Sequence, residues 1–193
     1  MRDIGATNLQ WSILLIQALV DQGFHRFVIS PGSRSTPLAL AVARNPKAKY
    51  WVVVDERSAA FFALGQSRYT LSSTSPPTPT ILICTSGSAV ANWLPAVVEA
   101  NHAALPLLLL SADRPPELHQ CGANQTIEQE GLFGVQVRAT HPLPPPDEIT
   151  HPRREITRLL TTLTKQLTLS IPGPIHLNIP FREPLLPLQP EQM

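Results

Sequence analysis

The feature that most constrains the fold of this chain is the alternation of short apolar runs with helical segments. The apolar runs are continuous, which is typical of strands in a parallel sheet whose two faces are both covered. Helical periodicity appears between them. The pattern predicts one doubly wound α/β domain, with a mostly parallel sheet and helices on both faces. The expected strands are residues 25–30, 51–54, 78–84, 106–110 and 174–179.

Local signals predict the helices between these strands. Thr7 and Gln10 have the spacing of a capping box, and Gly23 is a typical end for the first helix. A Ser/Thr/Pro-rich loop is expected at residues 70–79 and a proline-rich loop at residues 141–146. The other expected helices are residues 36–43, a segment that follows Asp55, residues 89–100 and residues 152–169.

Composition excludes several classes of protein. The chain has 193 residues, typical of one domain, and a net charge of +1 without a basic stretch, so neither nucleic acid nor an anionic membrane is an expected partner. Only 15% of residues are charged, against roughly 25% in an average domain, which indicates that part of the surface is covered. The histidines are scattered, so the sequence predicts no metal site of its own. The scattered cysteines, together with the lack of a secretory signal and of a membrane span, predict a cytoplasmic protein.

Polar clusters directly follow the expected strands. Carboxyl ends of parallel strands meet at one edge of the sheet, where open α/β folds bind ligands, so these clusters are expected to form a site. A single polar turn would carry little weight, because turns are usually polar, but here several converge, with glycines and arginines among them. The clusters are residues 31–35, 55–57, 85–88 and 113–114.

These clusters favour an anionic or polar ligand. Backbone N–H groups of the two Gly-Ser turns could face an anion or a polar ring. P-loop, G-x-G-x-x-G and G-x-S-x-G motifs are missing from the sequence, which disfavours the corresponding nucleotide and hydrolase sites. Arg34 and Arg114 could each bind a substrate carboxylate, or could form structural ion pairs with Asp55 or Asp113.

Two expected helical stretches, residues 58–67 and 86–98, contain no charged side chain. A helix without a polar face is buried on every side. Its cover could be a second copy of the chain or the rest of a larger subunit. Glu56 lies at the start of the first stretch, where burial would raise its pKa and the helix N-terminus would oppose that shift. Such a carboxyl can exchange a proton with a ring nitrogen, whereas an exposed N-cap residue would have no such role.

Five sequence blocks carry a resemblance to a known family. In order they are SPGSRSTPLALA, DERSAAFFALG, TSGSAVANWLPAVVEA, SADRPPELHQCGANQTI and GPIHLNIPFREPL. From about Thr7 to Pro184 the chain resembles the amino-terminal, pyrimidine-binding domain of thiamine-diphosphate enzymes. It is most similar to the 2-succinyl-5-enolpyruvyl-6-hydroxy-3-cyclohexene-1-carboxylate (SEPHCHC) synthases. The SPGSRS, ADRPPEL and GANQ blocks are specific to those synthases, whereas other thiamine enzymes share only the glutamate and the general pattern.

The resemblance implies roles for individual residues. Glu56 would contact N1′ of the aminopyrimidine of thiamine diphosphate, which explains an acid among apolar residues. Asp55 is expected in a structural pairing, for example with Arg57, and Cys84 is expected to be a buried strand residue. Residues implied near the aminopyrimidine are Pro31, Thr85, Ser86 and Asn92. Residues implied to bind isochorismate are Ser33, Arg34, Arg114, Asn124 and Gln125.

The resemblance also implies an activity. The family is a group of transferases that decarboxylate 2-oxoglutarate and add the succinyl unit to isochorismate, in menaquinone or phylloquinone biosynthesis. Residues 1–184 would form the pyrimidine-binding domain and residues 185–193 the start of a linker to a central domain. The Gly-Asp-Gly…Asn motif for Mg²⁺ or Mn²⁺ is missing from the sequence, so the chain is expected to be inactive alone. The two uncharged helical stretches lead us to expect a homodimer or larger homo-oligomer. The alternatives are another thiamine-diphosphate-dependent 2-oxo acid decarboxylase or carboligase, and a non-catalytic binding or dimerisation module.

Overall fold

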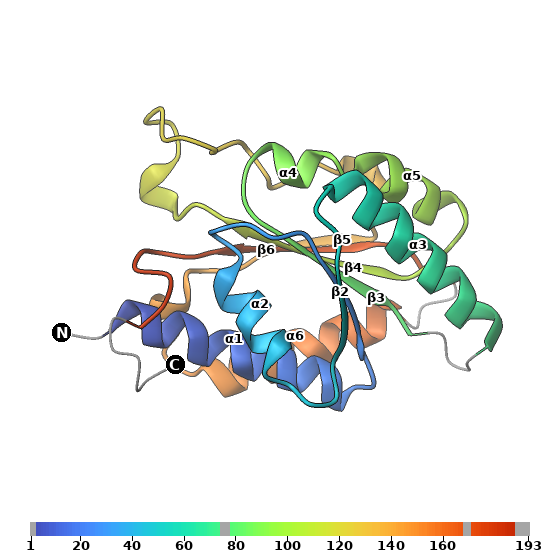
Figure 1. Ribbon diagram of the computed structural model, residues 1–193, viewed down its shortest axis with the longest axis horizontal. Helices are drawn as coiled ribbons and strands as arrows, with labels where there is room; N and C mark the ends of the chain where they lie inside the picture. The colour runs from blue at the N-terminus through green and yellow to red at the C-terminus, as the bar shows by residue number, and fades with distance from the viewer. Residues whose placement is uncertain (1–2, 74–77, 168–170, 188–193) are drawn as a thin grey trace.

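The computed structural model describes residues 3–73, 78–167 and 171–187. At its centre is a sheet of six parallel strands in the order β2-β1-β3-β4-β6-β5 (Figure 1). This arrangement confirms the predicted α/β domain with a parallel sheet. The strands are β1 Arg26–Ile29, β2 Lys49–Val52, β3 Thr80–Cys84, β4 Leu107–Asp113, β5 Ala139–Pro142 and β6 Ile175–Pro180.

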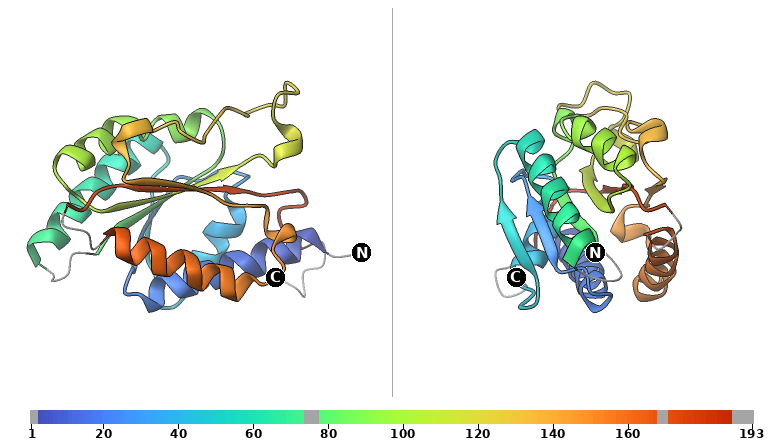
Figure 2. Two further views of the ribbon diagram at one scale, coloured as in Figure 1. Left: turned by 180° about the vertical axis from the view of Figure 1, so that it is seen from behind. Right: turned by 90° about the vertical axis from the view of Figure 1, so that its right-hand side faces the viewer.

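Helices cover both faces of the sheet, with α1, α2 and α6 on one face and α3, α4 and α5 on the other (Figures 1 and 2). In β4, Leu108 and Leu110 join the core under the first group, and Leu107 and Leu109 join the core under the second. Successive side chains of a strand point to opposite faces, so a strand covered twice must be apolar throughout. The helices are α1 Ile4–Asp21, α2 Thr36–Ala43, α3 Glu56–Ser73, α4 Ser88–Ala91, α5 Leu94–His102 and α6 Pro152–Leu167, with short 3-10 turns η1 Pro116–Leu118, η2 Gly134–Gln136 and η3 Pro146–Glu148.

The first helix begins earlier than the predicted capping box. Asp3 is its N-cap, and the Oδ1 atom of Asp3 accepts a hydrogen bond from the backbone N–H of Ala6 at 3.0 Å. Thr7 lies inside the helix, where its hydroxyl donates to the carbonyl oxygen of Asp3 at 2.9 Å. The predicted end is confirmed: Gly23 has a φ of 88°, a conformation that favours glycine after a helix.

Other elements also differ from the sequence expectation, and one is α3, which continues to Ser73 into the segment expected to be a loop. The helix expected at residues 89–100 is split into α4 and α5, because Pro95 has no N–H to donate to the carbonyl of Ala91. The sequence does not predict β5, whose Ala-Thr-His-Pro run lacks a strand pattern; Pro142 is tolerated because β5 is an edge strand. The other edge strand is β2, and all of its residues are exposed rather than buried.

The uncharged helices are buried on one side only within the described chain. The three alanines of α3 are buried against the sheet, whereas Phe61 and Phe62 are 43% and 42% exposed. In α5, Leu94 is 37% exposed. Trp51 of β2 packs edge-on against Phe62, with ring centroids 5.8 Å apart. The described chain therefore presents an apolar, aromatic surface along α3 and β2, and the predicted covering partner stays a prediction.

Candidate functional site

The turns that follow β1 and β3 are in direct contact at the carboxyl edge of the sheet. A Cβ atom at Gly32 would lie 2.3 Å from the Cβ of Thr85, so only glycine fits this approach. The backbone N–H of Arg34 donates to the Thr85 hydroxyl oxygen at 3.2 Å. Pro31 and Ser33 are exposed on the same turn. Two of the predicted polar clusters thus form one surface.

The turn after β3 is also joined to the loop that follows β4. The hydroxyl of Ser86 donates to the carbonyl oxygen of Gln125 at 3.2 Å, and Nε2 of Gln125 donates to the carbonyl oxygen of Ser86 at 2.9 Å. Gly87 has a φ of 85°, and an added Cβ would lie 2.7 Å from Cγ of Gln125. The N–H of Gly87 donates to Oε1 of Gln129 at 2.8 Å. Because this N–H is already bonded, it does not face an anion as the sequence suggests.

Glu56 is the first residue of α3, and its side chain is half-buried rather than fully shielded. Within the described residues its carboxylate makes no hydrogen bond and no ion pair. Cys84 is fully buried in β3, as predicted. Burial raises the pKa of the Cys84 thiol, and the charge of Glu56 adds to this effect. Glu56 follows β2, whose carboxyl end lies at the same edge of the parallel sheet as the Gly-Ser turn after β3.

Asp55 caps α3 instead of pairing mainly with Arg57. Its Oδ1 atom accepts a hydrogen bond from the backbone N–H of Ser58 at 2.7 Å. Hydrogen bonds from the hydroxyl and the N–H of Ser58 lower the pKa of Asp55, and the charge of Arg57 is the smallest of the contributions. The cap forms because a carboxylate just before a helix reaches the unpaired N–H groups of the first turn.

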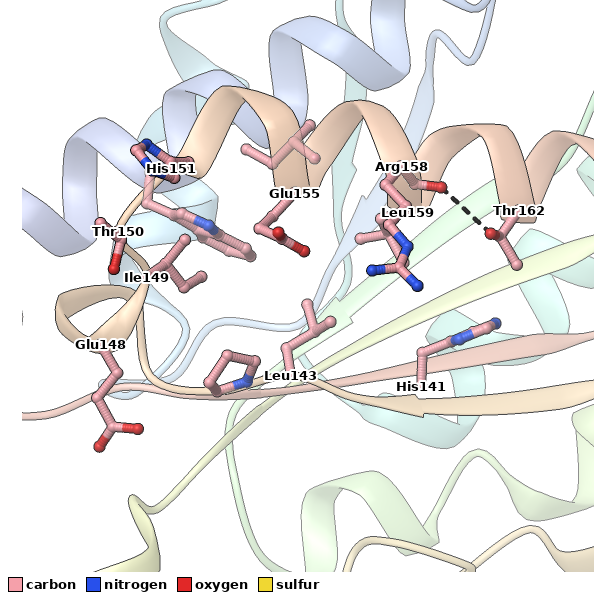
Figure 3. A pocket seen from close by; sticks show the side chains of 13 residues that line it. His141, Leu143, Glu148, Ile149, Thr150, His151, Glu155, Arg158, Leu159 and Thr162 are labelled. Carbon is pink, nitrogen blue, oxygen red and sulfur yellow. Dashed lines mark hydrogen bonds between the residues drawn. The ribbon is translucent and has the colours of Figure 1, made fainter.

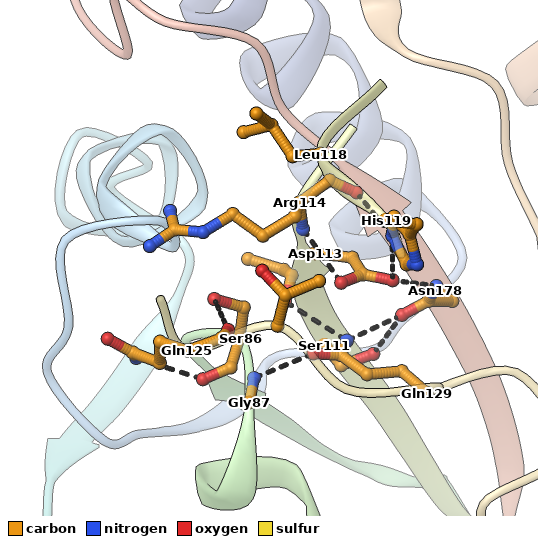
Figure 4. A network of polar contacts seen from close by, with 12 residues as sticks. Ser86, Gly87, Ser111, Asp113, Arg114, Leu118, His119, Gln125, Gln129 and Asn178 are labelled. Atoms are coloured by element: carbon orange, nitrogen blue, oxygen red, sulfur yellow. Dashed lines mark hydrogen bonds and ion pairs between the residues drawn. The ribbon is translucent and has the colours of Figure 1, made fainter. Parts of the chain in front are cut away.

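Three further predicted residues lie on segments that leave this edge. Arg114 follows β4, and its Nε and Nη2 atoms both donate to the carbonyl oxygen of Asn124 at 3.2 Å. The side chain of Asn124 is exposed. Asn92 follows α4, is also exposed, and donates from Nδ2 to the carbonyl oxygen of Ser88 at 3.0 Å. Figure 4 shows the Arg114 side chain extending away from His119 on the side where Gln125 lies.

Arg34, in contrast, is enclosed by the protein and only 2% exposed. Its Nη1 atom donates to the carbonyl oxygen of Phe181 at 2.8 Å, and Nη2 forms an ion pair with Glu183 at 2.6 Å. The ion-pair partner is therefore neither Asp55 nor Asp113. The Nε atom is buried without a hydrogen-bond partner in the described residues. Binding of isochorismate by Arg34 stays a prediction.

A buried polar network, which sequence reasoning misses, lies beside these turns (Figure 4). Oδ1 of Asn178 accepts hydrogen bonds from the Ser111 hydroxyl and from Nε2 of Gln129, each at 2.8 Å. Nδ2 of Asn178 donates to Oδ2 of Asp113 at 2.7 Å. The available signal was weak: Ser111 and Asn178 are polar residues that interrupt apolar strands, and Gln129 lies in an irregular loop.

His176 lies next to this network as a neutral ring. Its Nε2 atom is 2.7 Å from the Ser111 hydroxyl, and its ring packs edge-on against Phe133 at 5.0 Å between centroids. Burial lowers the pKa of His176 to about 4. Because Ser111 donates its single hydroxyl hydrogen to Asn178, Nε2 is assigned as the protonated nitrogen. Nδ1 is then a buried acceptor without a partner among the described residues, so a second proton would have no acceptor.

A separate groove of about 550 Å³ lies between α6 and the segment from β5 to η3 (Figure 3). Trp11, Leu143 and Ile149 contribute apolar surface to it. Glu155 and Arg158 of α6 point toward the strand side of the groove in Figure 3. The groove contains none of the residues predicted for the cofactor or the substrate. The candidate site is therefore the set of turns at the carboxyl edge.

Comparison with known proteins finds a matching family and similar, longer proteins. Residues 10–132 match the family described as thiamine pyrophosphate enzyme, N-terminal TPP binding domain. The chain is 49% identical over 190 residues to the SEPHCHC synthase of Dechloromonas aromatica, covering 98% of this chain and 34% of the relative. It is 51% identical over 187 residues to that of Pelodictyon phaeoclathratiforme, covering 95% and 30%, and 52% identical over 180 residues to that of Chloroflexus aurantiacus, covering 92% and 29%.

These relatives are longer proteins, and the chain spans about a third of their length. The matched family region includes the turns after β1, β2, β3 and β4, which are the turns that meet at the carboxyl edge. The parallel α/β architecture is consistent with a pyrimidine-binding domain. The chain belongs to the family of N-terminal, TPP-binding domains of thiamine pyrophosphate enzymes.

Proposed function

We propose that this chain is the pyrimidine-binding domain of a SEPHCHC synthase, which decarboxylates 2-oxoglutarate and adds the succinyl unit to isochorismate. The observation that carries the proposal is the match to curated synthases over 92–98% of the chain at about 50% identity. The arrangement of Glu56, the Gly-Ser turn and Arg114 at one sheet edge supports it. Residues 1–184 would be this domain, and residues 185–193 the start of a linker to a central domain; residues 188–193 lie outside the described residues.

The residues at the edge fit the aminopyrimidine half of thiamine diphosphate. Glu56 offers a carboxylate without a hydrogen bond or ion pair among the described residues, at the carboxyl edge of the sheet. The close approach of Gly32 to Thr85 leaves the two turns as one backbone surface for a flat ring. Pro31, Thr85, Ser86 and Asn92 are the residues we assign to that ring. When bound, thiamine diphosphate supplies the nucleophilic carbon and the electron sink for decarboxylation of a 2-oxo acid.

Glu56 would hold a proton at N1′ of the aminopyrimidine. A carboxyl in this position needs a dry environment to share a proton with a ring nitrogen, and the apolar residues of α3 supply part of it. The half-buried state of Glu56 means that further cover must come from the ring itself or from a partner surface. The exposed aromatic surface of α3 and β2 lies next to Glu56 in the sequence and is the natural place for that cover.

Arg114 would bind a carboxylate of isochorismate. Its guanidinium uses Nε and Nη2 to hold the carbonyl of Asn124, which orients the group and leaves Nη1 for the substrate. Ser33, Arg34, Asn124 and Gln125 complete the assigned set. For Arg34, substrate binding would require the guanidinium to share its contact with Glu183 or to exchange it.

The metal ion, the oligomeric state and the location are part of the same proposal. Among the described residues there is no cluster of three or more His, Cys, Asp or Glu that could hold a metal ion, so Mg²⁺ or Mn²⁺ would be held by another domain. The chain alone would then be inactive. A homodimer or larger homo-oligomer would cover α3 and β2.

Within the parts of the chain that the structure describes, no helix has the length and apolarity needed to cross a bilayer. The cytoplasmic location and the final quinone stay predictions.

The experiment is the Glu56→Gln substitution in the full-length protein that contains this chain. Glutamine cannot hold the proton, so release of CO₂ from 2-oxoglutarate is expected to fall by at least about 100-fold. The midpoint temperature of thermal unfolding of the 193-residue chain should not change, because the Glu56 carboxylate makes no hydrogen bond among the residues that the structure describes. Asp55→Asn is the matched control, because it changes the neighbouring carboxylate, keeps a cap acceptor, and should leave the rate near that of the wild type.

Substrate choice is tested with the same proteins. Turnover of 2-oxoglutarate with isochorismate supports the proposal. Turnover of pyruvate or benzoylformate in its place would instead support another thiamine-diphosphate-dependent decarboxylase or carboligase. A Glu56→Gln protein with the wild-type rate would contradict the assigned role of the carboxyl.

A further inference from the structure

Five residues form a continuous chain of hydrogen bonds, which we call the amide relay: Gly87, Gln129, Asn178, Asp113 and Arg114 (Figure 4). The N–H of Gly87 donates to Oε1 of Gln129 at 2.8 Å. Nε2 of Gln129 donates to Oδ1 of Asn178 at 2.8 Å, and Nδ2 of Asn178 donates to Oδ2 of Asp113 at 2.7 Å. Oδ1 of Asp113 accepts the backbone N–H of Arg114 at 2.7 Å. The relay thus joins the turn after β3 to the residue after β4.

The amide of Gln129 is fully used. The side chain is 0% exposed, and the second hydrogen of Nε2 is donated to the carbonyl oxygen of Ala112 at 3.2 Å. Its orientation is fixed, because the N–H of Gly87 can only donate and the carbonyl of Ala112 can only accept. A buried amide is tolerated only when its oxygen and its N–H groups are hydrogen-bonded. Position 129 therefore requires a side chain of the length of glutamine that carries both an acceptor and a donor.

The hydrogen bonds of the relay converge on the buried carboxylate of Asp113, which accepts from Asn178 on one side and from Arg114 on the other. Asp113 is 2% exposed, and burial raises its pKa, while hydrogen bonds from Asn178 and from the N–H of Arg114 act in the opposite direction. The imidazole of His119 also faces Asp113, with Nε2 at 3.9 Å from Oδ2. All bonds from Gly87 onward donate toward this carboxylate, and hydrogen bonds in series polarise one another. Loss of one bond should therefore weaken the others.

The two ends of the relay belong to the two sides of the proposed site. Gly87 follows Thr85 and Ser86, which are assigned to the cofactor ring. Arg114 is assigned to a substrate carboxylate. We propose that Gln129 and Asn178 are positioning residues that set the distance between the cofactor turn and the substrate arginine. The positioning role rests on the proposed function. The coupling between the N–H groups of Gly87 and Arg114 through the relay does not, because it is a property of the chain alone.

Amide hydrogen exchange of the 193-residue chain tests the coupling without any activity. Gln129→Met, which keeps the size of the side chain and removes its amide, should speed exchange at the N–H of Gly87 by about tenfold. The N–H of Arg114 should also exchange faster, although its own acceptor on Asp113 is unchanged. Rates are read as ratios to the amide of Leu109, in the central strand β4, so that a uniform loss of stability cancels.

The controls separate coupling from local damage. Gln136→Met removes another glutamine amide, which pairs with Asn101 and has no bond to the relay, so both exchange rates should stay as in the wild type. If Gln129→Met does not fold, Gln129→Asn keeps an amide that is too short to reach both Gly87 and Asn178, and the same two rates should rise. Faster exchange at Gly87 alone, or at neither amide, would overturn the inference.

Kinetics of the full-length protein test the positioning role. In Gln129→Met, kcat/KM for isochorismate should fall on the order of 100-fold, because condensation needs both sides of the site in register. Decarboxylation of 2-oxoglutarate, followed with an artificial electron acceptor, needs only the cofactor side and should fall by no more than about tenfold, as expected from the loss of the one bond to Gly87. Equal loss of both rates would overturn the positioning role. A wild type that does not condense the two substrates would refute the proposed function, and the exchange result would still decide the coupling.

Discussion

At the scale of residues, burial separates side chains that the sequence treats alike. Arg34 and Arg114 both follow a strand and both belong to family-specific blocks. The structure encloses Arg34 against Phe181 and Glu183, whereas Arg114 is half-buried and its Nη1 atom makes no hydrogen bond within the described residues. A buried guanidinium must be paired, because the cost of an unpaired buried charge is large. Arg114 is therefore the better placed of the two to meet a substrate.

The buried His176 gives a prediction at this scale. Its pKa is about 4 in the folded chain, below the ordinary value of 6.5, so the unfolded chain binds the proton first as the pH falls. The stability that a neutral His176 contributes is complete above pH 6.5 and is lost as the pH falls toward 4. His176→Leu cannot titrate, so between these pH values the wild type should lose roughly 3 kcal/mol more unfolding free energy than the variant.

Urea unfolding of both proteins across this pH range measures the difference. Asp113, with its raised pKa, contributes in the opposite direction, since its stability is gained as the pH falls, but it is present in both proteins. Only the difference between the two curves is therefore assigned to His176. Parallel curves would show that the imidazole is not held neutral by the fold.

At the scale of elements, the ends of helices depend on single contacts that a pattern can misplace. Thr7 and Gln10 have the spacing of a capping box, but Asp3 provides the cap, one turn earlier. The segment that follows β6 packs on this same turn: Asn8 donates from Nδ2 to the carbonyl oxygens of Arg182 and Pro184 at 2.8 and 3.2 Å. These contacts hold the start of α1 against a segment that is distant in the chain, and a local pattern cannot show them.

The position of the cap is tested by two alanine substitutions. Asp3→Ala should lower the unfolding free energy of the chain by about 1 kcal/mol, because the N–H of Ala6 loses its acceptor. Thr7→Ala is the matched control and should cost no more than about 0.5 kcal/mol, since its hydroxyl only adds a bond to a carbonyl. If Thr7→Ala lowers the unfolding free energy more than Asp3→Ala does, Thr7 rather than Asp3 is the cap, as the capping box predicts.

At the scale of the whole molecule, the described chain leaves apolar surface exposed. Trp51, Phe61 and Phe62 are 37–43% exposed, on β2 and α3, at one edge of the sheet. Aromatic groups exposed together on neighbouring elements are typical of a surface that another protein covers. We expect a second copy of the chain to pack on this surface, in agreement with the low content of charged residues.

Light scattering tests this surface directly. The wild-type chain should show a mass above 21.2 kDa that increases with concentration, and Phe61→Glu should shift it toward the monomer. Val135→Glu is the matched control, because Val135 is 86% exposed in η2, outside this surface, so its substitution should not affect association. A wild-type chain that stays monomeric at high concentration would contradict the prediction.

The fold class could be predicted because it depends on local properties. Continuous apolar runs with helical periodicity between them can be recognised in the sequence. Four strands, β1, β3, β4 and β6, have such runs and lie in the covered part of the sheet. Exposed β2 and the Pro-containing β5 could not be placed in this way. Strand order decides which strands lie at the edges, and that order is a property of pairing over long distances.

For the site, the sequence by itself determined which residue types follow each strand, and thus the likeness to a thiamine enzyme domain. Only the tertiary structure decided which of them touch. The pairing of Arg34 with Glu183, the relay through Gln129 and Asn178, and the binding of Arg182 to Glu117, Asp147 and Glu148 join residues far apart in the chain. Patterns report the local preferences of neighbouring residues, whereas the pairing of a buried polar atom depends on which distant group the completed core brings within hydrogen-bond distance.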